Sequence, residues 1–254
     1  GSPLAWLLLG PETKAPAPPS GGPGRSADGT GEGEKLAGLT KGPNFFYLHA
    51  ERRKWEWAEL HESFGESVVV VLTEEGAGSG YIVDPRGLVV TNYHVAEGGW
   101  IRKGIDVKVL HRVGKAIRPV VYKDCVPIYF DPIIDIAILE IREPPRYPFR
   151  PVVLSQADDY TTGDAVAAIG SPGTNTGAQL ENTITGGTIS SSERKDIWGA
   201  DYIQVDVAIN PGNSGGPIFS QYAEVIGMST WQYVGKQKLN FAVRIADIRE
   251  AVLA

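Results

Sequence analysis

Cysteine is almost absent from this chain of 254 residues, which contains only Cys125. A single cysteine cannot form a disulfide bond within the chain, so the fold must be held together by a hydrophobic core. Hydrophobic residues make up 42% of the sequence, which is enough to build such a core and excludes a wholly disordered chain. No histidine lies near Cys125 in the sequence, so we do not expect it to act as a nucleophile.

Long apolar runs and an excess of positive charge are also missing. No stretch reaches the roughly 20 apolar residues that span a bilayer, and the longest apolar run near the start is Leu4–Leu9. Gly1 and Ser2 are typical of a scar left by tag removal, so we expect the natural chain to begin earlier. Leu4–Leu9 is then either the end of a signal or membrane-anchor segment or an unstructured stub. The net charge of -6 argues against a nucleic-acid-binding protein.

Proline and glycine divide the chain into two parts. Between residues 10 and 44 they break any helix or strand, and we interpret residues 1–43 as a flexible N-terminal segment. Residues 44–254 are interpreted as a folded domain. Aromatic residues gather at the start of this domain, in Asn44–Leu48.

From residue 67 onward the sequence is typical of an all-β protein. Short apolar runs alternate with clusters of Gly, Pro and Asp, as in barrels and sandwiches. The expected strands are Ser67–Leu72, Gly78–Val83, Leu88–Thr91, Ile105–Leu110, Ile136–Ile141, Ala165–Ile169, Thr183–Ser190, Tyr202–Val207, Glu224–Met228 and Asn240–Val243. Two short helices are expected to flank them, near residues 50–63 and at Ile245–Leu253. The first is indicated by Trp57, Leu60 and Phe64, which fall on one helical face.

The segment Asn210–Pro217 carries the strongest chemical signal, because it places Ser214 among glycines. A nucleophilic serine needs an exposed hydroxyl and backbone N–H groups that point at a developing oxyanion, and glycine reaches the required backbone angles at low cost. We therefore predict Ser214 as the nucleophile and Gly212, Asn213 and Ser214 as the oxyanion hole. The N–H groups of Gly212 and Ser214 are the expected donors. The alternative is a plain glycine-rich turn.

His94 is the candidate general base among four histidines. It follows the expected strand Leu88–Thr91, which places it at a strand-to-loop exit. A neutral imidazole beside the serine takes its proton and later returns it to the leaving amine. The alternative is a buried structural histidine.

Asp135 is the candidate for the third member of the site. It begins the apolar strand Ile136–Ile141, where a carboxylate is costly unless it is paired, and pairing with His94 explains its presence. Asp131 precedes a proline and is interpreted as the cap of a turn. The order His94, Asp135, Ser214 is that of the chymotrypsin architecture and differs from the orders of α/β-hydrolases and subtilisins.

Together these motifs resemble those of the HtrA (Deg) family of trypsin-like serine proteases, over about residues 66–248. The segments that carry the resemblance are Gly78–Val83, Thr91–Val95, Asp135–Leu139, Ala168–Gly173, Asn182–Gly187, Gly212–Pro217 and Asn240–Val243. The resemblance implies two perpendicular six-stranded β-barrels, one at about residues 66–150 and one at about 151–245, with the active site between them. It implies a serine endopeptidase that needs no cofactor and no metal.

Two positions near Ser214 refine what the resemblance implies. Asn213 stands where digestive relatives carry an aspartate that pairs with a freed N-terminus, so activation by N-terminal cleavage is not expected. The resemblance instead implies a switch in which loops order the oxyanion hole. In this chain those loops lie near Ser190–Ala200 and Trp231–Lys238. Ala208 stands where trypsin-like digestive enzymes keep an acid, so cleavage after Lys or Arg is not expected.

The expected substrate-binding residues are Ala208, Ile209, Asn210, Met228, Ser229, Thr230 and Trp231. Ile209 and its apolar neighbours favour cleavage after aliphatic residues. The strand Met228–Thr230 is expected to pair with the substrate backbone by strand addition. Trp231 either narrows the groove or belongs to the core.

The resemblance further implies polypeptide substrates and a homotrimer formed through Phe45, Phe46 and Tyr47. Packing of these rings within one chain is the alternative. Family members often carry a PDZ domain after the protease, for which this chain has no room, and a bacterial periplasm or cell envelope is the expected location. The competing hypothesis is a catalytically silent or latent scaffold that binds peptides, and a small-ester hydrolase is a more distant one.

Overall fold

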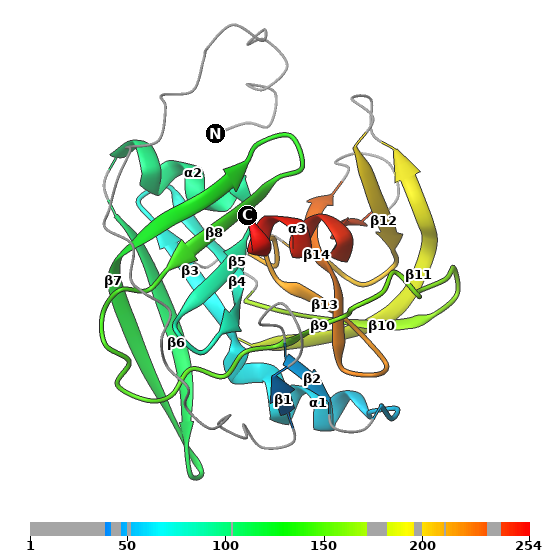
Figure 1. The fold of residues 1–254 in the computed structure, drawn as a ribbon, viewed down its shortest axis with the longest axis horizontal. Helices are drawn as coiled ribbons and strands as arrows, with labels where there is room; N and C mark the ends of the chain where they lie inside the picture. The colour runs from blue at the N-terminus through cyan, green and yellow to red at the C-terminus, as the bar shows by residue number, and fades with distance from the viewer. Residues whose placement is uncertain are drawn as a thin grey trace, which may run out of the picture. The chain divides into compact units, whose positions relative to one another are not determined.

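The computed structural model describes residues 39–41, 47–49, 52–102, 104–171, 182–195, 200–210, 212–232 and 240–254. The strands are β1 (Leu39–Lys41), β2 (Tyr47–His49), β3 (Val68–Thr73), β4 (Gly76–Asp84), β5 (Leu88–Thr91), β6 (Ile105–Val113), β7 (Ala116–Asp131), β8 (Ile136–Glu140), β9 (Val153–Leu154), β10 (Ala165–Gly170), β11 (Thr183–Lys195), β12 (Asp201–Val205), β13 (Pro217–Ser220), β14 (Glu224–Gln232) and β15 (Asn240–Arg244) (Figure 1). The helices are α1 (Trp57–Phe64), α2 (Tyr93–Arg102) and α3 (Ile245–Leu253), and a 3-10 turn spans Gly65–Ser67.

The first half of the folded part is a closed barrel with strand order β3-β4-β5-β8-β7-β6, called barrel one below. All of its strand pairs are antiparallel. Successive side chains on a strand point to opposite faces, so each strand divides its apolar residues between two places. On β8, Ala137 and Leu139 face the inside of the barrel, whereas Ile136 and Ile138 belong to a cluster shared with the second half.

The second half forms barrel two, with strand order β13-β10-β11-β12-β15-β14 and closure by the pairing of β13 with β14. Strand β9 adds to β14 as a parallel edge strand. The interior of barrel two is small and aliphatic, with Val166, Ile203, Val205 and Ile218 fully buried. The two six-stranded barrels confirm the expected fold class.

A shared hydrophobic cluster joins the barrels and the two amphipathic helices. Tyr81 and Val90 of barrel one meet Phe219 and Met228 of barrel two in this cluster. Helix α1 adds Leu60 and Phe64, and helix α3 adds Ile245, Ile248 and Ala251. Because side chains from both barrels bury each other, the seam between them is part of the core, and groups on either side of it are held at fixed distances.

Most expected elements are present, and the differences have physical causes. Helix α2 was not expected because Gly98 and Gly99 lie within it, and glycine is a poor helix former. Strand β7 was missed because Pro119 and Pro127 interrupt its apolar pattern. His94 consequently lies in the first turn of α2, so its expected place in a loop was wrong.

The N-terminal expectations are tested only in part. Strand β1 lies within the stretch interpreted as flexible and pairs with β2 in a two-stranded sheet. Phe45 and Phe46 lie outside the described residues, and Tyr47 is the first residue of β2. No helix in the described part of the chain is long and apolar enough to cross a membrane.

Candidate active site

His94 and Asp135 come together at one end of barrel one. His94 follows β5 by three residues, and Asp135 immediately precedes β8, which is the strand paired with β5. The His94 Nδ1 atom lies 3.0 and 2.9 Å from the two carboxylate oxygens of Asp135. Because the carboxylate accepts a hydrogen bond from Nδ1, the neutral imidazole carries its proton on Nδ1, and Nε2 is left as the basic atom.

Four other bonds fix the position of Asp135. Its Oδ1 accepts a hydrogen bond from the backbone N–H of His94 at 3.0 Å, and its carbonyl oxygen accepts from Asn92 Nδ2 and Tyr93 N at 3.0 and 3.2 Å. From barrel two, the Thr230 hydroxyl donates to Oδ2 at 2.5 Å. Asp135 also has a φ of 60°, a left-handed conformation that is rare for a residue other than glycine. Such a conformation persists where surrounding bonds impose it, and it often marks a functional site.

Asp131, the rejected alternative, does what the sequence predicted for it. Its Oδ1 accepts hydrogen bonds from the N–H groups of Ile133 and Ile134 at 2.8 and 3.2 Å. These bonds close the turn before β8, so Asp131 is a turn cap.

Ser214 lies across the seam from His94, in the loop before β13. Its hydroxyl donates to the carbonyl oxygen of Thr230 at 3.2 Å, and within the described residues it makes no hydrogen bond to His94. Its carbonyl oxygen accepts from the N–H of Ser79 at 2.8 Å, which ties the loop to barrel one. The His94–Asp135 pair is therefore joined directly, whereas the Ser214 hydroxyl is bonded to Thr230.

The loop around Ser214 depends on glycine at two positions. Gly212 and Gly215 have φ values of 99° and 86°, which side-chain-bearing residues rarely adopt. A Cβ on Gly215 would also collide with the carbonyl oxygen of Ser79. Of the three predicted oxyanion-hole residues, Asn213 uses its own N–H inside the loop, donating to Asn210 O at 2.9 Å. The N–H groups of Gly212 and Ser214 have no partner among the described residues, so they are the two available donors.

Ser79 is a site residue to which the sequence assigned no role. It is fully buried on β4, and its hydroxyl donates to the carbonyl oxygen of Gly212 at 2.6 Å while accepting from the N–H of Ser171 at 2.9 Å. The Gly212 carbonyl belongs to the peptide unit between the two available donors. Ser79 thus orients that unit from the opposite barrel. The only signal in the sequence is its place in Gly78-Ser79-Gly80, which carries no chemical motif.

The electrostatics of the site raise the pKa of the His94 imidazole. Desolvation opposes the charge on His94, but the hydrogen bond and charge of Asp135, with a further contribution from Glu97, raise the pKa of His94 above its usual value of 6.5. The His94 side chain is 43% exposed, so it is open to a substrate. Burial raises the pKa of Glu97.

The structure corrects part of the expected substrate-binding set. Ile209 is only 4% exposed and packs inside barrel two. Met228 pairs with Pro217 on one side and Val243 on the other, and Ser229 exchanges backbone hydrogen bonds with Gly215 and Gly216. Their backbones are therefore already paired, and the expectation that Met228 and Ser229 add to a substrate strand was wrong.

For the remaining members of that set, the substrate-binding role stays a prediction. Ala208 and Asn210 are exposed. Ala208 O lies 3.5 Å from the side-chain amide of Asn213. The carbonyl oxygen of Thr230 accepts a hydrogen bond from the Ser214 hydroxyl, and Trp231 follows Thr230 on β14.

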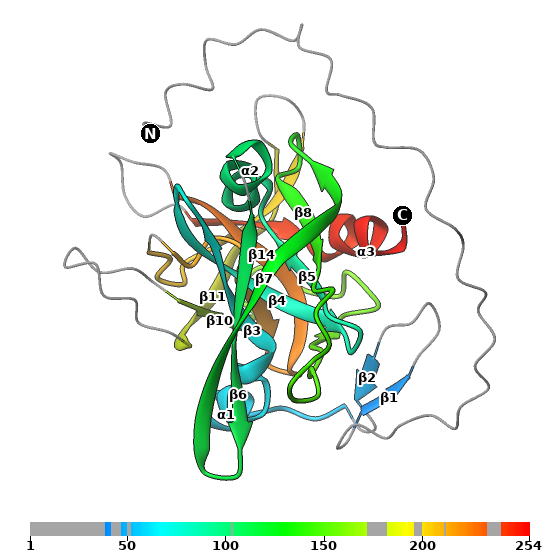
Figure 2. The same ribbon diagram turned by 90° about the vertical axis from the view of Figure 1, so that its left-hand side faces the viewer.

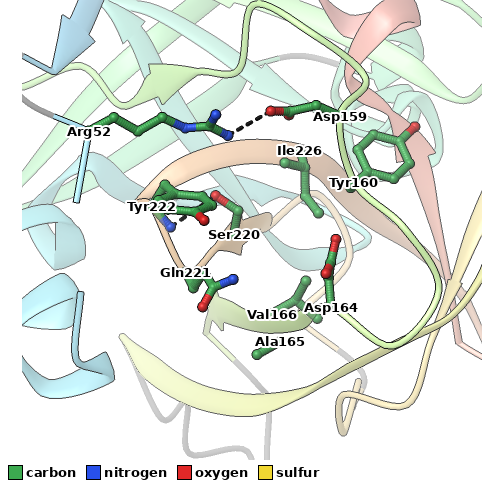
Figure 3. Close-up of a pocket in the computed structure, with 10 residues that line it drawn as sticks. All are labelled: Arg52, Asp159, Tyr160, Asp164, Ala165, Val166, Ser220, Gln221, Tyr222 and Ile226. Atoms are coloured by element: carbon green, nitrogen blue, oxygen red, sulfur yellow. Dashed lines mark hydrogen bonds and ion pairs between the residues drawn. The ribbon is translucent and has the colours of Figure 1, made fainter. Parts of the chain in front are cut away.

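Other candidate groups lie apart from this site. Burial raises the pKa of the Cys125 thiol to about 12, which makes it a poor nucleophile. A small surface pocket lies over barrel two, where Arg52 bonds Asp159 at 2.6 Å and stacks over Tyr222 (Figure 3). Its lining contains no residue of the His94–Asp135–Ser214 set, and its bonds attach the segment before α1 to the barrel. No cluster of three or more potential metal ligands occurs in the described residues.

Comparisons with known proteins show which proteins this chain is similar to. The family model described as a trypsin-like peptidase domain matches residues 78–228. Among curated proteins, the chain is 35% identical over 170 residues to Protease Do-like 1, chloroplastic, of Arabidopsis thaliana, covering 65% of this chain and 35% of that protein. It is 34% identical over 174 residues to a probable periplasmic serine endoprotease DegP-like of Halomonas elongata, covering 66% of this chain and 32% of that protein. The chain therefore spans about a third of the length of these relatives.

A solved structure gives the same result in three dimensions. The crystal structure of Deg5 superposes with a TM-score of 0.63 at 32% sequence identity. The match covers 76% of this chain and 90% of the Deg5 chain.

Proposed function

Because the chain belongs to the trypsin-like peptidase domain family, we propose that it is a serine endopeptidase of the HtrA type, with Ser214 as nucleophile, His94 as general base and Asp135 as the residue that orients the base. The observation that carries this proposal is the Asp135 carboxylate, which accepts from both His94 Nδ1 and the Thr230 hydroxyl. This arrangement leaves His94 Nε2 basic and turned away from its carboxylate partner.

The chemistry follows from these positions. His94 Nε2 takes the proton of Ser214 Oγ as that oxygen attacks the substrate carbonyl, and it later gives the proton to the leaving amine. The N–H groups of Gly212 and Ser214 stabilise the oxyanion of the tetrahedral intermediate. Water, activated by the same imidazole, then hydrolyses the acyl-enzyme and restores the serine.

We propose cleavage after aliphatic residues. The position six residues before Ser214 is Ala208, which carries no charge to bind Lys or Arg. The nearest carboxylate before it, Asp206, is held by Thr188, whose N–H and hydroxyl donate at 2.5 and 3.0 Å.

The proposed substrates are unfolded or partly folded polypeptides, and the proposed location is a bacterial periplasm or cell envelope. The name of the Halomonas elongata relative supports that location, whereas the Arabidopsis thaliana relative is chloroplastic. The homotrimer through Phe45, Phe46 and Tyr47 stays a prediction.

The test is labelling with a fluorophosphonate and digestion of unfolded casein, beside a Ser214→Ala variant. We expect the chain to label and cleave casein, and the variant to do neither, with a loss in kcat on the order of 10⁶-fold. An unlabelled chain with an intact fold, even with hydrophobic peptides added, would favour the peptide-binding scaffold. The Ser214 hydroxyl bonded to Thr230 O is the observation that keeps this second candidate open.

A further inference from the structure

A two-stranded ribbon formed by β6 and β7 projects beyond barrel one (Figure 2). Strand β6 pairs with β3 only through residues 106–108, and β7 pairs with β8 only from Val126 onward. Between these points the two strands pair with each other, down to a turn at Gly114 and Lys115. Residues 112–119, called the ribbon tip below, are all exposed.

The charge of the ribbon is opposite to that of the chain. Between Asp106 and Asp124 the sequence contains five basic residues and no acidic one, although the net charge of the chain is -6. At the base of the ribbon, Lys123 is bound by Asp106 at 2.5 Å. The cations of the tip are Arg112, Lys115 and Arg118.

Exposed aliphatic side chains lie beside these cations. Val113 and Ile117 in the tip are 42% and 49% exposed, and Val121 just above it is 37% exposed. Ile117 stands directly opposite Arg112 in the strand register. Side chains opposite each other on adjacent strands share one face, so this face combines an apolar group with a cation.

On each strand of the ribbon, one backbone N–H is occupied by a carboxylate. The N–H of Arg112 donates to Glu66 Oε2 at 2.7 Å, and the N–H of Lys123 donates to Glu143 Oε1 at 2.6 Å. Carboxylates at these donors disfavour pairing with a second copy of the chain. The tip of eight residues is also small beside the roughly 20 to 30 residues a side of a stable protein interface.

We propose that the ribbon tip docks on an anionic lipid surface. Val113 and Ile117 enter the headgroup region, and Arg112, Lys115 and Arg118 contact lipid phosphates. This inference is independent of the proposed protease activity, because no residue of the tip belongs to the candidate active site.

The experiment is co-sedimentation of the full chain with phosphatidylcholine vesicles that contain or lack phosphatidylglycerol. We expect binding only to the anionic vesicles, and weaker binding as salt is raised. Each cation near such a surface contributes about fivefold to the affinity, so Lys115→Gln with Arg118→Gln lowers it about 25-fold. Ile117→Ser lowers it as well, because less apolar surface enters the headgroup region.

The matched control is Arg194→Gln with Lys195→Gln, which removes the same charge from exposed positions at the end of β11 in barrel two. We expect it to bind almost as well as the unchanged chain. Failure of the unchanged chain to bind, or an equal loss in the control, overturns the proposal. Unchanged binding by Ile117→Ser overturns the insertion of the tip. Binding of polyglutamate that depends on Lys115 and Arg118, without vesicle binding, assigns the tip to an acidic protein instead.

Discussion

The two halves of the candidate active site are fixed by different means. In barrel one, His94 and Asp135 are joined directly by side-chain and backbone hydrogen bonds. In barrel two, Ser214 lies in a glycine-rich loop, and its hydroxyl is bonded to Thr230 rather than to the base. The base is thus oriented within one barrel, whereas the setting of the nucleophile depends on the seam between the barrels.

Each half of the site also accepts one hydrogen bond from a hydroxyl group of the opposite barrel. Thr230 of barrel two donates to Asp135, and Ser79 of barrel one donates to the carbonyl oxygen of Gly212. These two bonds are reciprocal in position but serve different chemical steps. Variants that remove them one at a time separate orientation of the base from stabilisation of the oxyanion.

The largest fall in kcat is expected from a change to Asp135, in the half of the site that barrel one supplies. Asp135→Asn keeps the shape of the side chain and tolerates the left-handed backbone, but its amide cannot hold His94 in the required tautomer. We expect kcat to fall about 10⁴-fold, as measured with a peptide substrate. Asp131→Asn is the matched control and should stay within a fewfold of the unchanged chain, because Asp131 only caps a turn. Comparable losses in the two variants would contradict the assignment of Asp135.

The next largest fall in kcat is expected from removing the Ser79 hydroxyl, which supports the Ser214 loop of barrel two. Ser79→Ala removes the hydrogen bonds to Gly212 O and Ser171 N, so the peptide unit between the two oxyanion donors loses its support. We expect kcat to fall roughly 10- to 100-fold with little change in KM. The free energy of unfolding should fall by about 1–3 kcal/mol, because buried polar groups are left unpaired.

The control for this variant is Ser67→Ala. Ser67 is also fully buried, but its hydroxyl has no partner among the described residues. Its removal should therefore leave kcat unchanged. A fall in kcat for Ser67→Ala equal to that for Ser79→Ala would mean that the effect comes from general loosening of the fold.

A smaller effect is expected from the reciprocal bond. Thr230→Val keeps the shape of the side chain and removes the donor to Asp135 Oδ2, while His94 keeps its own bonds to the carboxylate. We expect a loss in kcat of about tenfold, because one charge-assisted hydrogen bond is removed. Ser229→Ala is the control, since the buried Ser229 hydroxyl has no partner among the described residues. A loss for Thr230→Val larger than that for Asp135→Asn would reverse the comparison.

The sequence was sufficient to select His94, Asp135 and Ser214 as candidates, because each lies in a short motif at a predicted strand end. Their chemistry is local: Ser214 needs glycines beside it, and Asp135 needs a partner to be tolerated in an apolar strand. The all-β class followed from the spacing of the apolar runs, whereas the two six-stranded barrels were implied by the resemblance to the HtrA family. Helix α2 was missed because its two glycines oppose helix propensity, and only packing against barrel one explains them.

The contributions from across the seam were not predictable from local patterns. Ser79 acts on a residue 133 positions away, and nothing in its neighbourhood in the sequence marks that contact. Met228 and Ser229 were taken for a free strand edge, because a sequence does not show which edges other strands already occupy. Strand register and edge occupancy are properties of the closed barrel.

The smallest expected effect concerns the pH dependence set by the first half. Catalysis needs neutral His94, and Asp135 and Glu97 raise the pKa of its imidazole despite desolvation. The value of kcat/KM should therefore fall as the pH drops through a midpoint above 6.5. Glu97→Gln removes one negative charge that favours the protonated imidazole, so the midpoint should move to lower pH. Glu59→Gln, in the first turn of α1, where the carboxylate is paired with Arg53, should leave it unchanged. A midpoint that Glu97→Gln does not move would mean that the acidic limb reports a group other than His94.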